Sequence, residues 1–304
     1  MRIALIGQAA FAQRVLDGVR ARGHEVAAVY CPPDTGGGKP DPVKVRALDL
    51  GIPVHQHRAL KGADVAATFA GHGADLGLLA YVTQIVPPAV FDAPRLGSIC
   101  FHPSLLPRYR GGSAIPWQII KGETRTGVSV FWVDPGIDTG PLLLQKDAPI
   151  GADDTGASLY YNTLFELGID TVLEAVDLID AGRAPRLVQD EAQASYDPLC
   201  RDEHAAVDWR RPVGEVYNLI RGCDPQPGAY VDRGSARVRF YDARRVDSAA
   251  AAPGTITVLD DAGLTVAASG GAIRIGRLRV GDQKLAAREA AASLGLSVGQ
   301  PIAG

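Results

Sequence analysis

A histidine and two aspartates occupy loops that follow strand-like runs, and these residue types can move protons. His102 ends an apolar run, and a loop with several Pro and Gly residues follows it. Asp134 and Asp138 lie in a second such loop, after another apolar run. Because ligands bind at strand ends in open α/β sheets, these residues predict an acid–base pair at neighbouring strand ends. A hydrogen-bonded loop histidine and turn-capping aspartates are the structural alternative, since spacing alone does not show that the side chains meet.

Short apolar runs alternate with helical patterns over the first two thirds of the chain. We expect strands at 3–6, 26–30, 76–81, 98–101 and 128–133, and helices at 11–22 and 157–179. Alternation of this kind predicts an α/β fold with a mostly parallel sheet. The Pro- and Gly-rich stretch 32–38 between two of these elements predicts a loop.

The pattern changes near Arg201, where we expect a domain boundary. A short helix is expected at 213–220, and short strands at 236–240, 255–259, 264–267 and 272–278. Short strands separated by Gly and Asp predict a small β-barrel or sandwich. The alanine-rich stretch 248–252 is expected to be a surface loop.

Composition and charge exclude several classes of protein. The chain has 304 residues, of which 46% are hydrophobic and 21% charged, so it is neither disordered nor a coiled coil. A net charge of −3 argues against a protein that mainly grips nucleic acid through a basic surface, although a local basic patch stays open. No signal peptide or membrane-spanning run is recognisable, and the four cysteines form no paired motif. We therefore expect a soluble cytoplasmic protein without a disulfide framework.

Two cofactor classes lack their sequence signals. The turn after the first strand reads Gly7-Gln8-Ala9-Ala10-Phe11-Ala12, with one glycine where a dinucleotide fingerprint needs three. This argues against NAD. The six histidines form no metal-ligand motif beyond His55-x-His57, so no metal is expected.

The two candidate loops together resemble the 10-formyltetrahydrofolate-dependent formyltransferase family. The resemblance rests on the run His102-Pro103-Ser104-Leu105-Leu106-Pro107 and on Asp134-x-Gly136-x-Asp138-Thr139-Gly140. Further similar pieces are Gln84-Ile85-Val86-Pro87, Leu142-Leu143-Leu144-Gln145-Lys146 and Asp153-Asp154-Thr155. The chain is most similar to the N-terminal hydrolase domain of the 10-formyltetrahydrofolate dehydrogenases, and it also resembles the methionyl-tRNA formyltransferases. The resemblance implies a Rossmann-like folate-binding domain over 1–200 and a C-terminal β-barrel domain over 201–304.

Roles for single residues follow from the resemblance. It implies that His102 is catalytic and interacts with the formyl group, and that Asp138 is a catalytic partner that manages the proton of the nucleophile. Gln84, Ile85 and Val86 match the loop that lines the folate pterin pocket. Cys100, Asp134 and Asp138 match further positions beside the folate.

Cys100 departs from the transferase pattern, which has an asparagine two residues before the histidine. The hydrolase domain has an aliphatic residue there, so Cys100 favours the hydrolase branch. A buried thiol that packs as a small hydrophobe is the main interpretation of Cys100, and a nucleophile is the alternative. Arg108 and Arg110 are either solvated loop residues or contacts for an anion such as a folate glutamate tail.

The expected function is therefore an enzyme of one-carbon metabolism that binds 10-formyltetrahydrofolate. It removes the formyl group to water, which gives formate and tetrahydrofolate. The alternative is transfer to an amine, such as methionyl-tRNA, an amino sugar or a carrier-bound aminoacyl group; tRNA is not excluded. A folate-binding protein without catalysis is a third hypothesis. Because the sequence ends at residue 304, we expect no aldehyde dehydrogenase part and no oxidation of the formyl group.

Overall fold

The structure is a computed structural model, and it describes residues 1–34, 36–247 and 251–304. Thr35 of the expected loop 32–38 and residues 248–250 of the expected loop 248–252 lie outside this range. The chain forms two compact units whose segments alternate along the sequence. Unit 1 comprises Met1–Gly112, Gly127–Ala148 and Thr163–Tyr196, and unit 2 comprises Ser113–Thr126, Pro149–Asn162 and Asp197–Gly304. A domain boundary at 200/201 stays a prediction.

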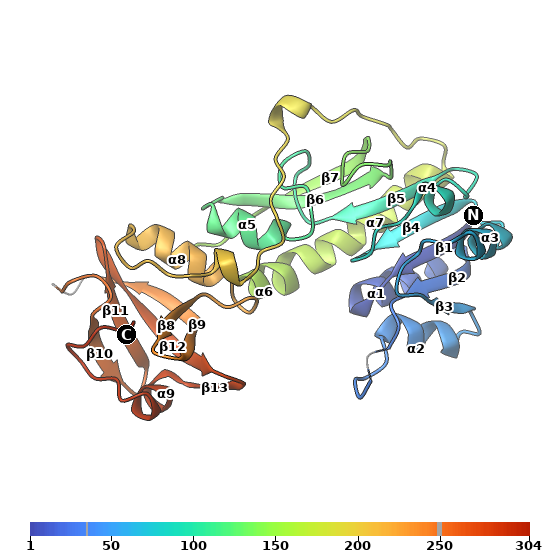
Figure 1. Cartoon of the computed structure of the whole chain (residues 1–304). Coiled ribbons are helices and arrows are strands. Elements are labelled where there is room, and N and C mark those ends of the chain that lie inside the picture. Colours follow the sequence, from blue (N-terminus) through green and yellow to red (C-terminus); the bar gives the residue numbers. More distant parts are fainter. Residues whose placement is uncertain (35, 248–250) are drawn as a thin grey trace. The chain divides into compact units, whose positions relative to one another are not determined.

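A seven-stranded sheet has the strand order β3-β2-β1-β4-β5-β6-β7 (Figure 1). It carries the two candidate loops, the one after His102 and the one that contains Asp134 and Asp138. Its strands are β1 Arg2–Gly7, β2 Glu25–Cys31, β3 Val54–Gln56, β4 Leu76–Ala80, β5 Ser98–His102, β6 Arg125–Trp132 and β7 Leu142–Pro149. Neighbours from β3 to β5 pair in parallel, and β6 pairs antiparallel with β5. The predicted α/β fold with a mostly parallel sheet is confirmed.

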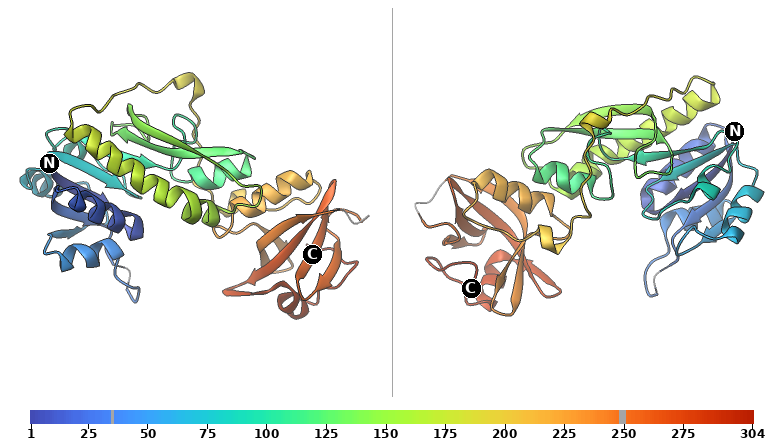
Figure 2. Two further views of the ribbon diagram at one scale, coloured as in Figure 1. Left: turned by 180° about the vertical axis from the view of Figure 1, so that it is seen from behind. Right: turned by 45° about the horizontal axis from the view of Figure 1, so that its top comes forward.

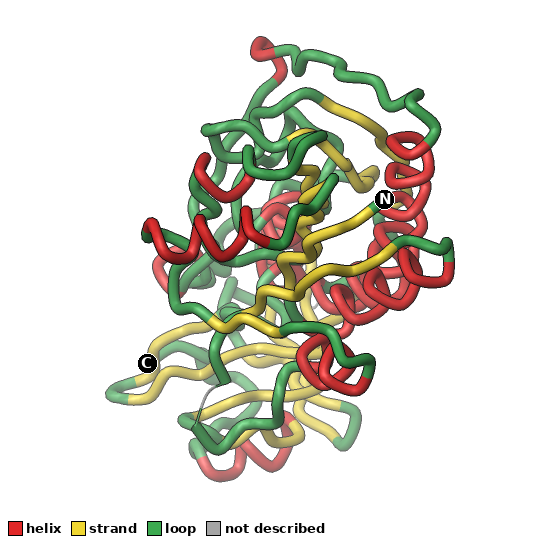
Figure 3. The backbone as a smooth tube through the Cα atoms, turned by 90° about the vertical axis from the view of Figure 1, so that its right-hand side faces the viewer, coloured by secondary structure: helices red, strands yellow, loops and turns green. Residues whose placement is uncertain are grey.

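Helices cover this sheet and fix the strand that carries His102. The helices of unit 1 are α1 Ala9–Ala21, α2 Pro42–Asp49, α3 Ala63–Gly71, α4 Pro88–Phe91 and α7 Phe165–Asp180, and a 3-10 turn spans Glu191–Gln193. In Figure 2 (left), α1 and α7 lie in front of the strands, and Figure 3 shows the helices in red beside the yellow strands. A Cβ at Gly168 would lie 2.5 Å from the ring of Phe101, so a glycine lets α7 approach β5.

The long helix expected at 157–179 is divided into three parts. It consists of α6 Gly156–Leu159, a π-helical turn Tyr160–Leu164 and α7. Thr155 caps its start, because its hydroxyl accepts from the Ser158 amide at 3.1 Å while the Ser158 hydroxyl accepts from the Thr155 amide at 2.9 Å. Apolar periodicity does not reveal a π turn, since the extra residue only shifts the buried face.

Unit 2 is built around a separate antiparallel sheet, as the short strands predict. Its strands are β8 Tyr230–Arg233, β9 Ala236–Val246, β10 Ile256–Asp260, β11 Gly263–Ala268, β12 Gly271–Val280 and β13 Gln283–Ala286. The order is β10-β11-β12-β9-β8, and β13 pairs with β12. Its helices are α5 Ala114–Ile120, α6, α8 Val213–Gly222 and α9 Ala287–Ser293, and a 3-10 turn spans Asp202–His204. Alternate residues of β9, such as Val238 and Phe240, fill its core.

The four cysteines are free thiols, and they differ in acidity. A hydrogen bond from Cys223 lowers the pKa of Cys200, and the same contact together with burial raises the pKa of Cys223. Burial raises the pKa of Cys31 to about 11 and that of Cys100 well above its ordinary value. Because the thiolate is the reactive form, we expect Cys200 to react first with iodoacetamide at pH 8. Peptide mass spectrometry over a labelling time course checks this, and earlier labelling of Cys31 would contradict it.

Within the described ranges, no helix is long and apolar enough to span a lipid bilayer.

Candidate functional site

The loop after β6 brings Asp138 to His102, although the two strand ends are not neighbours. Because β5 and β6 are antiparallel, His102 lies opposite Ser129, and Trp132 at the end of β6 lies opposite Ile99. The two residues therefore meet as expected and follow neighbouring strands, but the ends of these strands lie at opposite edges of the sheet. The loop that follows β6 must run back along β5, and it then places a carboxylate oxygen of Asp138 3.4 Å from Nδ1 of His102.

The hydrogen bonds of His102 assign its proton. Nε2 lies 2.7 Å from the carbonyl oxygen of Tyr109, and a carbonyl only accepts, so Nε2 carries hydrogen and donates. In the neutral imidazole, Nδ1 then has a lone pair that faces Oδ2 of Asp138. Two acceptors 3.4 Å apart either share a proton or are bridged by a small donor that lies beside the pair. The side chains are 7% and 18% exposed, so this arrangement is largely shielded from solvent.

Buried hydrogen bonds fix the loop that follows His102. The hydroxyl of Ser129 donates to the Ser104 carbonyl at 2.6 Å and accepts from the Leu106 amide at 3.1 Å. The Gln145 side chain donates to the Leu106 carbonyl and to the Ser129 hydroxyl. Because Ser129 lies opposite His102 on the neighbouring strand, the same residue pairs with the backbone of His102 and holds the loop that follows it.

The backbone at Asp138 adopts an uncommon conformation for a residue with a side chain. Its φ is +56°, in the left-handed region, which costs of order 1–3 kcal/mol unless surrounding contacts impose it. The amide of Gly111 donates to Oδ2 of Asp138 at 2.8 Å. The Gln189 side chain donates to the backbone carbonyls of Asp138 at 2.9 Å and of Gly140 at 2.7 Å. Sequence reasoning missed the role of Gly111, although it lies in the loop after His102, and it missed Gln189, which lies in no recognisable motif.

Cys100 lies on the same side of β5 as His102, since side chains two residues apart on a strand share a face. Its thiol donates weakly to the Phe101 carbonyl at 3.5 Å. Burial and the Asp138 carboxylate both raise the pKa of the Cys100 thiol well above its ordinary value. The thiol therefore stays protonated, and the nucleophile alternative loses its physical basis.

The predicted folate loop follows β4, and it packs against the same buried cluster as Cys100. Val86 and Cys100 both pack against the buried cluster that contains Ile6, Tyr30 and Leu79. The Gln84 side chain donates to the backbone carbonyl of His57 at 2.8 Å. Ile85 is 78% exposed, so a large apolar side chain there is open to a ligand. Binding by these three residues stays a prediction.

Asp134 shapes its own loop. One oxygen of its carboxylate accepts from the Gly136 amide at 3.0 Å and from the Thr139 hydroxyl at 2.6 Å. The turn-capping alternative therefore describes these contacts. A direct contact with folate at Asp134 stays a prediction.

Arg110 is not an available anion contact. It is 7% exposed, and its guanidinium donates to Gln189 and forms a two-pronged ion pair with Glu191 at 2.6 and 2.9 Å. Hydrogen bonding to Glu191 raises the pKa of the Arg110 guanidinium. The anion interpretation is wrong for Arg110, because protein groups already occupy its donors.

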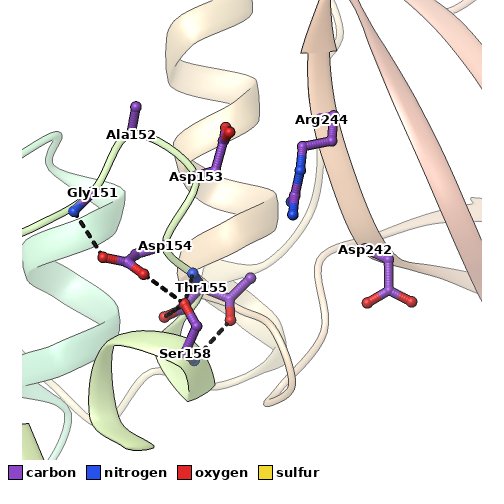
Figure 4. Close-up of a pocket in the computed structure, with 8 residues that line it drawn as sticks. All are labelled: Gly151, Ala152, Asp153, Asp154, Thr155, Ser158, Asp242 and Arg244. Carbon is purple, nitrogen blue, oxygen red and sulfur yellow. Dashed lines mark hydrogen bonds between the residues drawn. The ribbon is translucent and has the colours of Figure 1, made fainter. Parts of the chain in front are cut away.

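Two cavities differ in size and in the residues that line them. A cavity of about 840 Å³ in unit 2 is lined by none of the predicted site residues (Figure 4). Its lining residues Asp154, Thr155 and Ser158 hydrogen-bond one another at the start of α6, so they are explained as caps. A second cavity, in unit 1 beside Gly7 and Gln84, has about 10 Å³ and holds at most one water molecule, far less than a pterin ring.

Across the described part of the chain, no group of three or more His, Cys, Asp or Glu side chains could hold a metal ion.

Comparison with known proteins identifies the family that this fold and site define. A family model described as "Formyl transferase" matches residues 1–176, and one described as "Formyl transferase, C-terminal domain" matches residues 200–295. The chain belongs to the formyl transferase family.

Two curated relatives differ in how much of their length they share with this chain. The cytosolic 10-formyltetrahydrofolate dehydrogenase of Homo sapiens is 42% identical over 80% of this chain, which spans only 27% of that relative. The methionyl-tRNA formyltransferase of Ruegeria pomeroyi is 40% identical over 92% of both chains. Among solved structures, HypX from Aquifex aeolicus in complex with tetrahydrofolic acid is 22% identical with a TM-score of 0.73. The match covers 99% of this chain and 49% of HypX, and it shows the shared fold.

Proposed function

We propose that this chain binds 10-formyltetrahydrofolate and hydrolyses its formyl group to formate, releasing tetrahydrofolate. The observation that carries the proposal is the pair of facing acceptors, Nδ1 of His102 and Oδ2 of Asp138, 3.4 Å apart. A water molecule has two hydrogens, and it can donate one to each acceptor. Both acceptors then increase the nucleophilicity of its oxygen.

The positions of these two acceptors determine the order of the proposed reaction steps. The water oxygen attacks the formyl carbon, and its proton passes to Nδ1 of His102. The imidazolium that forms is stabilised by the Asp138 carboxylate and by the Tyr109 carbonyl that accepts from Nε2. Return of the proton to the folate nitrogen lets the C–N bond break, which gives tetrahydrofolate and formic acid, and the acid releases its remaining acidic proton to solvent as formate. A protonated imidazole beside the tetrahedral oxygen also offsets its negative charge.

Water is proposed as the acceptor because of Cys100. Its weak donor is directed at the Phe101 carbonyl, so no side-chain amide at this position supports a formyl oxygen. The similarity to the 10-formyltetrahydrofolate dehydrogenases supports the same interpretation. A cytoplasmic location is part of the proposal, supported by the four free thiols.

Transfer to an amine is the second candidate. It is favoured by the methionyl-tRNA formyltransferase relative, which shares 92% of its length with this chain. An amine with two N–H groups could donate to His102 and Asp138 as water does.

The test measures tetrahydrofolate release from 10-formyltetrahydrofolate, with and without methionyl-tRNA or a nucleotide-linked amino sugar. We expect release without any amine, and its loss in His102→Ala. Release only in the presence of an amine would replace the hydrolase proposal by the transferase. Binding without release under every condition would overturn both.

Cys100→Asn tests the choice of acceptor. The asparagine adds an amide donor beside His102, and a single donor to a developing oxyanion is worth about 10²–10³ in rate in an optimised site. Because the transferases that the chain resembles have an asparagine here, we expect transfer to methionyl-tRNA to rise by about tenfold relative to hydrolysis, which is less than the full effect of one donor. Product analysis by chromatography gives the ratio. An unchanged ratio with efficient transfer in the original protein would favour the transferase.

A further inference from the structure

The segment that follows α7 returns to both loops of the candidate site. Leu187 and Leu142 exchange backbone hydrogen bonds of 2.7 and 2.9 Å, which ties the segment to the start of β7. Ser195 binds the other loop, because its hydroxyl accepts from the Tyr109 amide at 2.8 Å and its carbonyl accepts from the Arg110 amide at 2.9 Å. The stretch between these anchors lies outside both matched family regions, 1–176 and 200–295.

Gln189 lies between the anchors, and it is 4% exposed. Its amide nitrogen donates to the carbonyls of Asp138 and Gly140, and its oxygen accepts from Arg110 at 2.8 and 3.2 Å. Two of these contacts hold the backbone at Asp138 and Gly140. The other two hold Arg110, the residue before Gly111, whose amide donates to the Asp138 carboxylate. A buried amide with both ends occupied has a single favourable orientation, so it transmits position rather than merely filling space.

Asp138 needs such support on two sides. Its backbone is held at a φ of +56°, and Gln189 binds the carbonyl of that same residue. Its carboxylate receives the Gly111 amide, which directly follows Arg110 in the chain. Because Gln189 also fixes Arg110, the backbone and the carboxylate of Asp138 are both positioned from one side chain.

We propose that Gln189 is the positioning residue that holds the Asp138 carboxylate at His102. The inference rests on the proposed function, since it assigns Gln189 a part in that reaction. Gln189 touches none of the reacting groups, and it acts through the Asp138–Gly140 backbone and through Arg110. Its removal therefore affects turnover more than folate binding.

Two substitutions distinguish the hydrogen bonds that Gln189 donates from the packing of its side chain. Gln189→Glu keeps the shape and the acceptor for Arg110 but removes both donations to the Asp138 and Gly140 carbonyls. Gln189→Met keeps the length and removes every polar contact. Gln193→Met is the matched control, because Gln193 lies exposed in the same segment and its side chain donates to Asp190 at 2.7 Å.

We expect both Gln189 variants to lower kcat about 10²-fold, the loss that a misplacement of about 1 Å can cause, with the folate Kd within about threefold. The control should keep both values. In an Asp138→Asn background, Gln189→Glu should lower the remaining rate by less than about threefold, because a positioning residue has nothing left to position. A full additional loss in that background, or an equal loss of folate affinity, would overturn the inference.

Hydrogen exchange separates this inference from the proposed function. If the original protein turns over neither with water nor with an amine, the proposed function fails. The backbone amides of residues 138–140 should nevertheless exchange at least tenfold faster in Gln189→Met than in Gln193→Met. Unchanged exchange there, at an unchanged melting temperature, would overturn the positioning role by itself.

Discussion

Asp138→Asn should lower the release of tetrahydrofolate by about 10³–10⁴-fold, by analogy with the loss when an aspartate that orients a catalytic histidine becomes an amide. The physical reason is that both Nδ1 of His102 and Oδ2 of Asp138 act as acceptors for the attacking water. An asparagine with its oxygen at the position of Oδ2 is uncharged, so it accepts more weakly from the water and no longer stabilises the imidazolium of His102. The Gly111 amide can still donate to the asparagine oxygen, so the loop is expected to keep its geometry.

Asp170→Asn is the matched control for this substitution. Asp170 lies exposed on α7 and changes charge in the same way without approaching the site. Steady-state rates and folate titration of both variants check the prediction. A rate for Asp138→Asn within tenfold of the original protein would contradict a role in proton transfer.

Gly140→Ala should have the largest effect on stability. An added Cβ would lie 1.7 Å from the Trp132 carbonyl oxygen, and a backbone group cannot turn away as a side chain can. Overpacking costs typically 1–3 kcal/mol, and we expect about 3 kcal/mol or more here, a fall in melting temperature of about 6–12 °C. Turnover should fall as well, since the Gly140 carbonyl accepts from Gln189.

Gly71→Ala is the control for this glycine. Gly71 ends α3, and an added Cβ would meet nothing within 4 Å. Alanine has the higher helix propensity, so we expect no loss of stability. Thermal unfolding followed by circular dichroism compares the two variants. An equal melting temperature for both would show that the loop around Gly140 can relax.

The sequence predicts the layers of this fold better than their connections. Buried strands such as β1 and β4 read as apolar runs, and β9 reads as alternation, because burial on two faces or on one leaves those patterns. The antiparallel direction of β6 leaves no such mark, since a buried strand has the same composition in either direction. The alternation of the two units along the chain is likewise a property of long-range contacts.

The candidate site could be predicted as far as its motifs extend. His102 and Asp138 are recognisable through their surrounding Pro and Gly residues, and the structure brings them to 3.4 Å. Gln189 could not be found, because one glutamine in a polar stretch is usually exposed. Arg110 was misinterpreted for the same reason: a charge in a loop reads as solvated until its partner Glu191, distant in the sequence, is known.

The alternation of segments constrains how such a protein can be recombined. The chain passes from one unit to the other five times, and residues 113–126 and 149–162 of unit 2 are inserted between parts of unit 1. No single crossover in the gene can therefore exchange one whole unit for that of a relative. A chimera joined at residue 176 would also separate Gln189 from the Asp138 it contacts. Any single join within the chain therefore leaves at least one unit assembled from two parent proteins.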